Sequence, residues 1–153
     1  MTGPSPVDRR KLGSKHHVVT DAGGIPLAVR ISAANRHDVT QLIPLVDAIP
    51  PIGGKVGRPV QRPALIVADR GYDSDPHREE LSHRGIASLI AERNTDHGSG
   101  FGVLRWVVER TISWLHQFRR QRIRYERRAD IHQAFLTLGC ILICHRYLVG
   151  SFF

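Results

Sequence analysis

The chain has 153 residues, the length of one domain with room for a buried core. Hydrophobic residues make up 41% of the chain and charged residues 24%, which excludes general disorder. The formal net charge of +8 favours a polyanionic partner, nucleic acid before membrane, because no basic amphipathic stretch offers a wide lipid-facing surface.

The N-terminal third predicts a basic segment followed by a β-hairpin. Residues 1–14 combine glycine, proline and serine with basic side chains, and we expect them to form a flexible lead-in. Residues 16–20 and 25–33 have strand character, and the second run alternates apolar with other residues. The turn between them contains Gly23 and Gly24, both expected to supply positive φ angles. A helix over 39–48, ended by two prolines, and a flexible basic loop over 52–62 follow.

The stretch ALIVADRGYDSD contains the first candidate functional residue. Its apolar run, residues 64–68, is bounded by Pro63 and Gly71 and predicts a buried strand of a parallel or mixed sheet. The run leads directly into Asp69, which places a carboxylate at the carboxyl end of that strand, the usual location of ligands in open α/β folds. Asp69 is therefore a candidate metal-binding catalytic residue. The alternative is that it only caps the turn after the strand.

The remaining pattern alternates helices and strands. We expect a helix from an Asp75 N-cap to residue 83, a strand over 87–91, a polar loop over 92–102, a long helix over 103–125 and a last helix over 130–148. The last helix is apolar on nearly all sides, so it should be buried in this fold or in a partner. The order predicts a mixed sheet flanked by helices, in which one sheet edge lacks a strand because the hairpin begins almost at the first residue.

Cysteine spacing and hydropathy indicate a soluble cytoplasmic protein. Cys140 and Cys144 stand four residues apart in an apolar helical stretch, which favours buried thiols over a disulfide. The N-terminus lacks the apolar core of a signal peptide, and the longest apolar run, residues 138–144, is too short to cross a membrane.

The long predicted helix carries a second carboxylate and most of the arginines. Glu109 lies beside its apolar stripe, and the alternative to a functional role is an Arg105–Glu109 pair at i, i+4 contributing about 0.2–0.5 kcal/mol. Residues 105–128 hold eight arginines against two glutamates, which favours contact with phosphates over a merely solvated helix face. The residues that we expect to bind DNA are Lys15, Arg105, Arg110, Arg119, Arg120, Arg122 and Arg124.

Four blocks of the sequence together resemble one family. ADRGYDSD and WVVERTISWL resemble the second and third signature regions of IS5 family transposases within the IS4-like DDE superfamily. LGSKHHVVTDAGGIPLAV and SAANRHDVTQLIPLVD resemble the segment between the first and second acidic residues of that family. The resemblance implies an RNase H-like domain over residues 15–150 and metal-dependent cleavage and strand transfer of insertion-sequence ends. Asp69 and Glu109 match the second and third acidic residues, and Arg105 matches the arginine before the glutamate. Gly102 stands where many relatives carry a tyrosine.

The first aspartate of the family has no counterpart in this chain. Neither Asp8 nor Asp21 matches it, and we expect the first strand, which carries it, to be missing. Two Mg²⁺ or Mn²⁺ ions are then expected only when that residue is supplied, because two carboxylates cannot fix both ions at their working distance. We expect the isolated chain to lack strand-transfer activity. It would be either a second reading frame or a degraded copy.

The resemblance also implies partners and alternatives. The partners would be insertion-sequence ends, an upstream-frame product or a second copy, in a bacterial cytoplasm and associated with the nucleoid. The main alternative is a non-catalytic DNA-binding or dimerising remnant. A metal-dependent hydrolase of small phosphoesters fits less well, because arginine is in excess and a phosphate loop is lacking.

Overall fold

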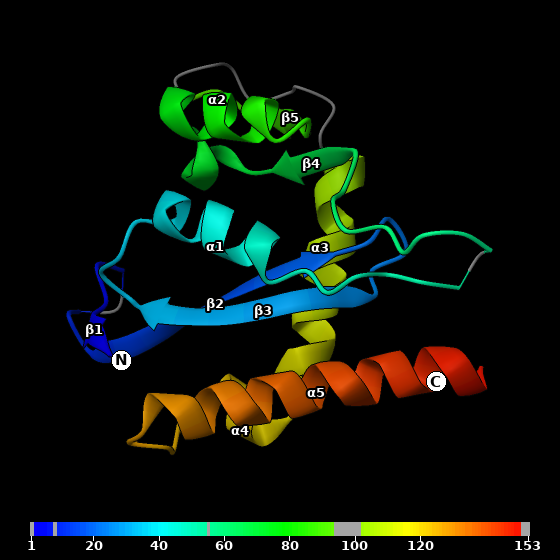
Figure 1. Ribbon diagram of the computed structural model, residues 1–153. Helices are drawn as coiled ribbons and strands as arrows, with labels where there is room; N and C mark the ends of the chain where they lie inside the picture. The colour runs from blue at the N-terminus through cyan, green and yellow to red at the C-terminus, as the bar shows by residue number, and fades with distance from the viewer. Residues whose placement is uncertain (1, 8, 55, 94–101, 151–153) are drawn as a thin grey trace.

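The computed structural model describes residues 2–7, 9–54, 56–93 and 102–150, without the side chains of 102–105. It confirms an α/β fold. Three antiparallel strands, β1 (Gly3–Pro4), β2 (Leu12–Thr20) and β3 (Pro26–Ala33), form one sheet, and β4 (Leu65–Ala68) pairs in parallel with β5 (Ala87–Ile90) to form another. Helices lie on both sides of the β2–β3 hairpin (Figure 1).

The predicted hairpin is confirmed, and its turn is organised by Asp21. The Oδ1 atom of Asp21 accepts hydrogen bonds from the backbone N–H of Gly23 at 2.9 Å and of Ile25 at 2.8 Å. Of the two glycines, Gly24 alone has a positive φ, +89°, because the Asp21 side chain satisfies the turn without a second left-handed residue. Strand β2 begins at Leu12 and pairs with β1, so strand pairing starts inside the segment expected to be a lead-in.

Alternation along β2 divides the core into two parts. Val18 packs against a cluster formed by Leu115, Leu136, Cys140 and Ile143, whereas Val19 packs against a cluster formed by Leu42, Val46, Ile66, Leu81, Ile86 and Ile90. Successive side chains of a strand point to opposite faces, so one hairpin anchors both clusters. Burying each of these leucines and isoleucines stabilises the fold by about 1.5–3 kcal/mol.

The first layer of helices covers one face of the hairpin. The 3-10 helix η1 (Asp38–Gln41) leads into α1 (Leu42–Asp47), which contacts β2 and β3 on one side and α2 (Asp75–His83) on the other (Figure 1). The N-cap of α2 is Ser74, one residue before the expected Asp75, and proline lies in its first turn as predicted.

The opposite face is covered by α3 (Gly102–His116), α4 (Arg119–Arg122) and α5 (Ala129–Val149). The prediction of one continuous helix over 103–125 is wrong. The chain leaves the helix after His116, and Phe118 is extended with ψ 118°. The break allows a close approach to α5, because a Cβ atom added to Gly139 would lie 3.0 Å from Leu115 Cδ2 and 3.5 Å from Phe118 Cδ2. This tertiary contact outweighs the helical preference of the arginine-rich segment.

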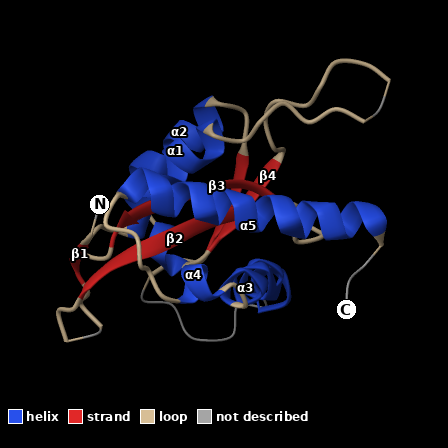
Figure 2. Ribbon diagram, turned by 90° about the horizontal axis from the view of Figure 1, so that it is seen from below, coloured by secondary structure: helices blue, strands red, loops and turns tan. Residues whose placement is uncertain are grey.

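The last predicted helix is confirmed as α5, but its apolar side chains are only partly buried by the chain itself. Seen from below, α5 lies in front of the hairpin with its outer side facing the viewer (Figure 2). Cys140 is buried and Cys144 half-buried, and both are free thiols, as predicted. No helix among the described residues is long and apolar enough to span a membrane.

The two sheets differ from the single mixed sheet expected. Within the described ranges, β2 and β4 are not hydrogen-bonded to each other, and the two sheets are joined by the packing of Val19 against the cluster that includes Ile66. Beyond its short pairing with β1, the outer edge of β2 has no strand partner in the described part of the chain, and neither has one edge of β4.

Candidate functional site

Asp69 lies where the sequence analysis expected, directly after β4 at the carboxyl end of a parallel strand pair. Its side chain is exposed, and its Oδ1 accepts a hydrogen bond from the backbone N–H of Gly71 at 2.9 Å. Asp69 is thus the N-cap of the short 3-10 helix η2 (Arg70–Tyr72). Asp69 therefore does cap the turn, and the same hydrogen bond holds its carboxylate at the end of the strand.

A second carboxylate approaches the same turn. A Cβ atom placed on Gly71 would lie 3.0 Å from Asp69 Oδ1 and 3.2 Å from Asp38 Oδ2, so both aspartates converge on the backbone at Gly71. Lys15 balances this negative charge, because its Nζ lies 2.8 Å from Asp38 Oδ1. No signal in the linear sequence pattern links Asp38 to Asp69.

A chain of polar side chains connects the turn at Asp69 to the hairpin. The Tyr72 hydroxyl lies 3.0 Å from His17 Nδ1, and His17 Nε2 lies 2.8 Å from Ser32 Oγ. Burial raises the pKa of Tyr72 far above its usual range, and the nearby carboxylates of Asp38 and Asp69 raise it further. Burial also lowers the pKa of His17, which keeps its imidazole neutral at pH 7. Tyr72 and His17 therefore position the turn through neutral hydrogen bonds.

Glu109 lies on the exposed side of α3, whose inner side is fixed to the hairpin turn. Thr111 Oγ1 donates a hydrogen bond to the carbonyl of Gly24 at 2.7 Å, and Arg110 donates to the carbonyl of Gly23 at 2.6 Å. Helix α3 also contacts β4, the strand directly before Asp69. The structure thus packs together the two elements that carry the predicted acidic residues.

The described residues do not complete a metal centre. Carboxylate oxygens are the ligands that Mg²⁺ prefers, so Asp69, Asp38 and Glu109 have suitable chemistry. However, no group of three or more His, Cys, Asp or Glu side chains within the described ranges is arranged to hold a metal ion. The structure supplies ligands of the right kind and leaves the set incomplete.

Most of the cations expected to bind DNA have partners inside the fold. Lys15 pairs with Asp38, and Arg110 stacks over Trp106 and Trp114 with its Cζ atom 4.4 and 4.8 Å from the ring centroids. Arg120 pairs with the buried carboxylate of Glu126. Arg124 donates hydrogen bonds to the Ser14 hydroxyl and to the carbonyl of Glu126. The side chain of Arg105 lies outside the described residues.

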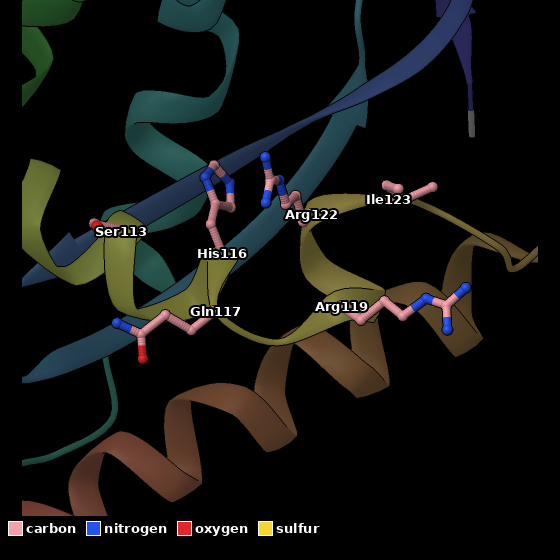
Figure 3. Close-up of a pocket in the computed structure, with 6 residues that line it drawn as sticks. All are labelled: Ser113, His116, Gln117, Arg119, Arg122 and Ile123. Atoms are coloured by element: carbon pink, nitrogen blue, oxygen red, sulfur yellow. The ribbon is translucent and has the colours of Figure 1, made fainter.

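Arg119 and Arg122 are exposed, and they differ from these residues because they line one hollow. The hollow, of about 670 Å³, lies between the end of α3 and α4 and is lined by Ser113, His116, Gln117, Arg119, Arg122 and Ile123. Arg119 Nε donates to the Tyr125 hydroxyl at 3.0 Å. His116 and Arg122 point to the same side, whereas Arg119 extends away from them (Figure 3). This lining combines two guanidiniums with other polar side chains and contains no carboxylate.

Comparison with known proteins places the chain in a family. Residues 2–144 match the model of the family described as "Transposase DDE domain". One relative, from Burkholderia cepacia, is named as a transposase for insertion sequence element IS402. It is 66% identical over 143 residues, which cover 94% of this chain and 68% of that protein. The transposase for insertion sequence element IS1106 of Neisseria meningitidis serogroup B is 30% identical over 129 residues, 78% of this chain and 40% of that protein. No solved structure gives a significant match. The chain belongs to the DDE transposase family of insertion sequences.

Proposed function

We propose that the chain is the C-terminal part of the catalytic domain of an IS5-type transposase that cleaves and joins insertion-sequence ends, with Asp69 and Glu109 as catalytic metal ligands. The observation that carries this proposal is the exposed carboxylate of Asp69 at the end of β4, on the strand that contacts the helix bearing Glu109. Two divalent cations held there would supply activation of the attacking oxygen and stabilisation of the leaving oxygen. Asp69 and Glu109 would each hold Mg²⁺ or Mn²⁺ through hard oxygen ligands.

The first carboxylate of this site would come from a strand outside the chain. Within the described ranges, the edge of β2 beyond its short pairing with β1 and one edge of β4 lack a strand partner, which supports this proposal. A strand between them would join the two sheets into the single mixed sheet of an RNase H-like domain. An upstream-frame product is the partner we propose for that role. Asp38, already paired with Lys15, would help to hold Asp69 in place.

The hollow lined by Arg119 and Arg122 is the DNA contact that we propose for the described surface. Guanidiniums recognise phosphate oxygens with several donors at once, and Ser113 and Gln117 add neutral donors. A DNA duplex contacted here would leave Arg110, Arg120 and Arg124 in their structural roles.

The second candidate function is a DNA-binding remnant without catalysis. The carboxylates brought together among the described residues favour it, because two ligands alone hold divalent cations weakly. The two candidate functions share the proposed DNA contact. They differ in whether Asp69 takes part in DNA cleavage.

A strand-transfer assay distinguishes them. We expect purified residues 1–153 with Mg²⁺ or Mn²⁺ to bind duplexes carrying insertion-sequence ends but to show no strand transfer. Adding an upstream-frame product whose strand ends in aspartate should restore cleavage, and Asp69→Ala should then lower it by at least about 100-fold. Glu79→Gln, which removes an exposed carboxylate of α2, is the matched control. If the restored cleavage is unchanged in Asp69→Ala, the catalytic assignment is contradicted. If the chain alone nicks DNA robustly and Asp69→Ala abolishes this activity, the need for a partner is contradicted.

A further inference from the structure

Helix α5 has one buried side and one long exposed apolar side. Its inner residues, which include Leu136, Gly139, Cys140 and Ile143, pack against α3 and the hairpin. Its outer side, seen in Figure 2, has no cover among the described elements. Exposed there are Ile131 (41%), Leu138 (50%), Ile141 (57%), Leu142 (42%), Leu148 (86%) and Val149 (54%). Soluble monomers seldom leave so continuous an apolar surface to water.

The exposed residues follow the spacing of a coiled-coil seam. Positions 131, 134, 138, 141, 145 and 148 alternate steps of three and four residues, and all six side chains are exposed. We call these six residues the α5 seam: Ile131, Ala134, Leu138, Ile141, His145 and Leu148. Helices that bury one face in their own core show a wider stripe, whereas this strict spacing suits a facing helix. The core-facing positions of α5 fall between the seam positions, so one helix serves both surfaces.

A second copy of the same helix fits the seam in the antiparallel direction. When residue i faces residue 279 − i of the other copy, Ile131 meets Leu148 and Leu138 meets Ile141, and Ala134 leaves space for the larger His145. In a parallel pair His145 would instead face His145. The antiparallel direction also places each helix N-terminus near the C-terminus of the other helix.

Charge and area favour this occupant over a nucleic acid. The α5 seam contains no lysine, arginine, aspartate or glutamate, so it offers nothing to phosphates. The exposed apolar residues present on the order of 600 Å² per copy, so a two-fold pair would bury on the order of 1,200 Å², the lower end of specific interfaces.

We propose that two copies of this chain associate through an antiparallel α5–α5 contact centred between Gly139 and Cys140. The contact is isologous, since each residue of the α5 seam meets its counterpart twice around the two-fold axis. It lies on α5 and leaves the hollow at Arg119 and Arg122 to DNA.

Sedimentation of the purified chain tests the contact. We expect dimers at about 100 μM that dissociate on dilution to about 1 μM, consistent with an interface of modest area. Raising the salt from about 0.1 to 0.5 M should strengthen the dimer, because two copies of charge +8 repel each other. Leu138→Glu should yield a folded monomer, as judged by circular dichroism. Val56→Glu adds the same charge at another fully exposed apolar position and should leave the dimer intact.

A double variant tests the direction of the pair. Leu138→Lys combined with Ile141→Glu places opposite charges across an antiparallel contact and like charges across a parallel one, so the double variant should regain the dimer that each single variant loses. A wild-type chain that remains monomeric at about 100 μM would overturn the proposal and leave the α5 seam to another partner. Dimers that persist in Leu138→Glu, or a double variant that stays monomeric, would also overturn it.

Discussion

Replacing both Arg119 and Arg122 by alanine is expected to weaken binding to a duplex of about 30 base pairs by roughly 10- to 100-fold and to lower the log–log salt slope by about 1.8. Both residues are exposed, line the same hollow and face no carboxylate among its lining residues. Each phosphate that they neutralise contributes about 0.9 to the slope, so the slope reports directly on their number. Fluorescence anisotropy of a labelled duplex at several salt concentrations measures both quantities.

Two comparisons make this result specific. Arg58→Ala with Arg62→Ala removes the same charge from the loop before β4 and should change the slope much less. Arg120→Ala should act instead on stability, because it leaves the buried Glu126 carboxylate without its guanidinium. Equal losses of affinity in all three variants would show that net charge alone controls binding. They would contradict the assignment of the hollow as the DNA contact.

The second large effect is a loss of stability in mild acid, caused by the contact between half-buried His16 and buried His132. His16 Nε2 on β2 lies 2.9 Å from His132 Nε2 on α5, and this contact joins the hairpin to the helix. Burial, and after it the neighbouring His132, His116, His17 and Arg124, together lower the pKa of His16 to about 4. Burial also lowers the pKa of His132, against the opposing effect of Glu126, whose Oε2 lies 3.5 Å from His132 Nδ1.

Protonation therefore favours the unfolded chain. Its histidines bind protons near pH 6.5, whereas the folded protein keeps His16 neutral down to about pH 4. Stability is full above about pH 6.5 and falls as the pH decreases towards 4, with His16 alone accounting for about 3 kcal/mol. Urea unfolding between pH 7 and pH 4 measures this loss.

A matched pair of variants assigns the loss to the buried site. His16→Leu should be less stable at pH 7, because His132 loses its partner, but its stability should change much less between pH 7 and pH 4. His83→Gln removes an exposed histidine of α2 and should keep the wild-type profile. An unchanged slope in His16→Leu would show that other groups control the response to acid.

Local patterns were enough to predict most of the elements and the position of Asp69. The hairpin follows from strict alternation and from Asp21 and the glycines of its turn, and β4 follows from five small and apolar residues bounded by Pro63 and Gly71. The last helix follows from its apolar content. These features depend on residues close together in the chain.

The features that the sequence analysis missed depend on tertiary contacts. The break after His116 is caused by packing of Leu115 and Phe118 against Gly139 of α5, and the helical stripe runs through it without a signal. The approach of Asp38 to Asp69 arises only when η1 meets η2. The number of arginines predicts a basic segment but not the role of each arginine. Arg120 pairs with the buried carboxylate of Glu126, whereas Arg122 faces solvent in the hollow.

The central claim is that Asp69 and Glu109 are metal ligands of a DNA-cleaving site, and Mn²⁺ binding measured by electron paramagnetic resonance tests it most directly. Titrations of the chain bound to duplex DNA would compare the wild type with Asp69→Asn, Glu109→Gln and the control Glu79→Gln. We predict that each of the first two variants weakens Mn²⁺ binding by about 10-fold and that the control does not. Wild-type Mn²⁺ affinity in both Asp69→Asn and Glu109→Gln would contradict the claim.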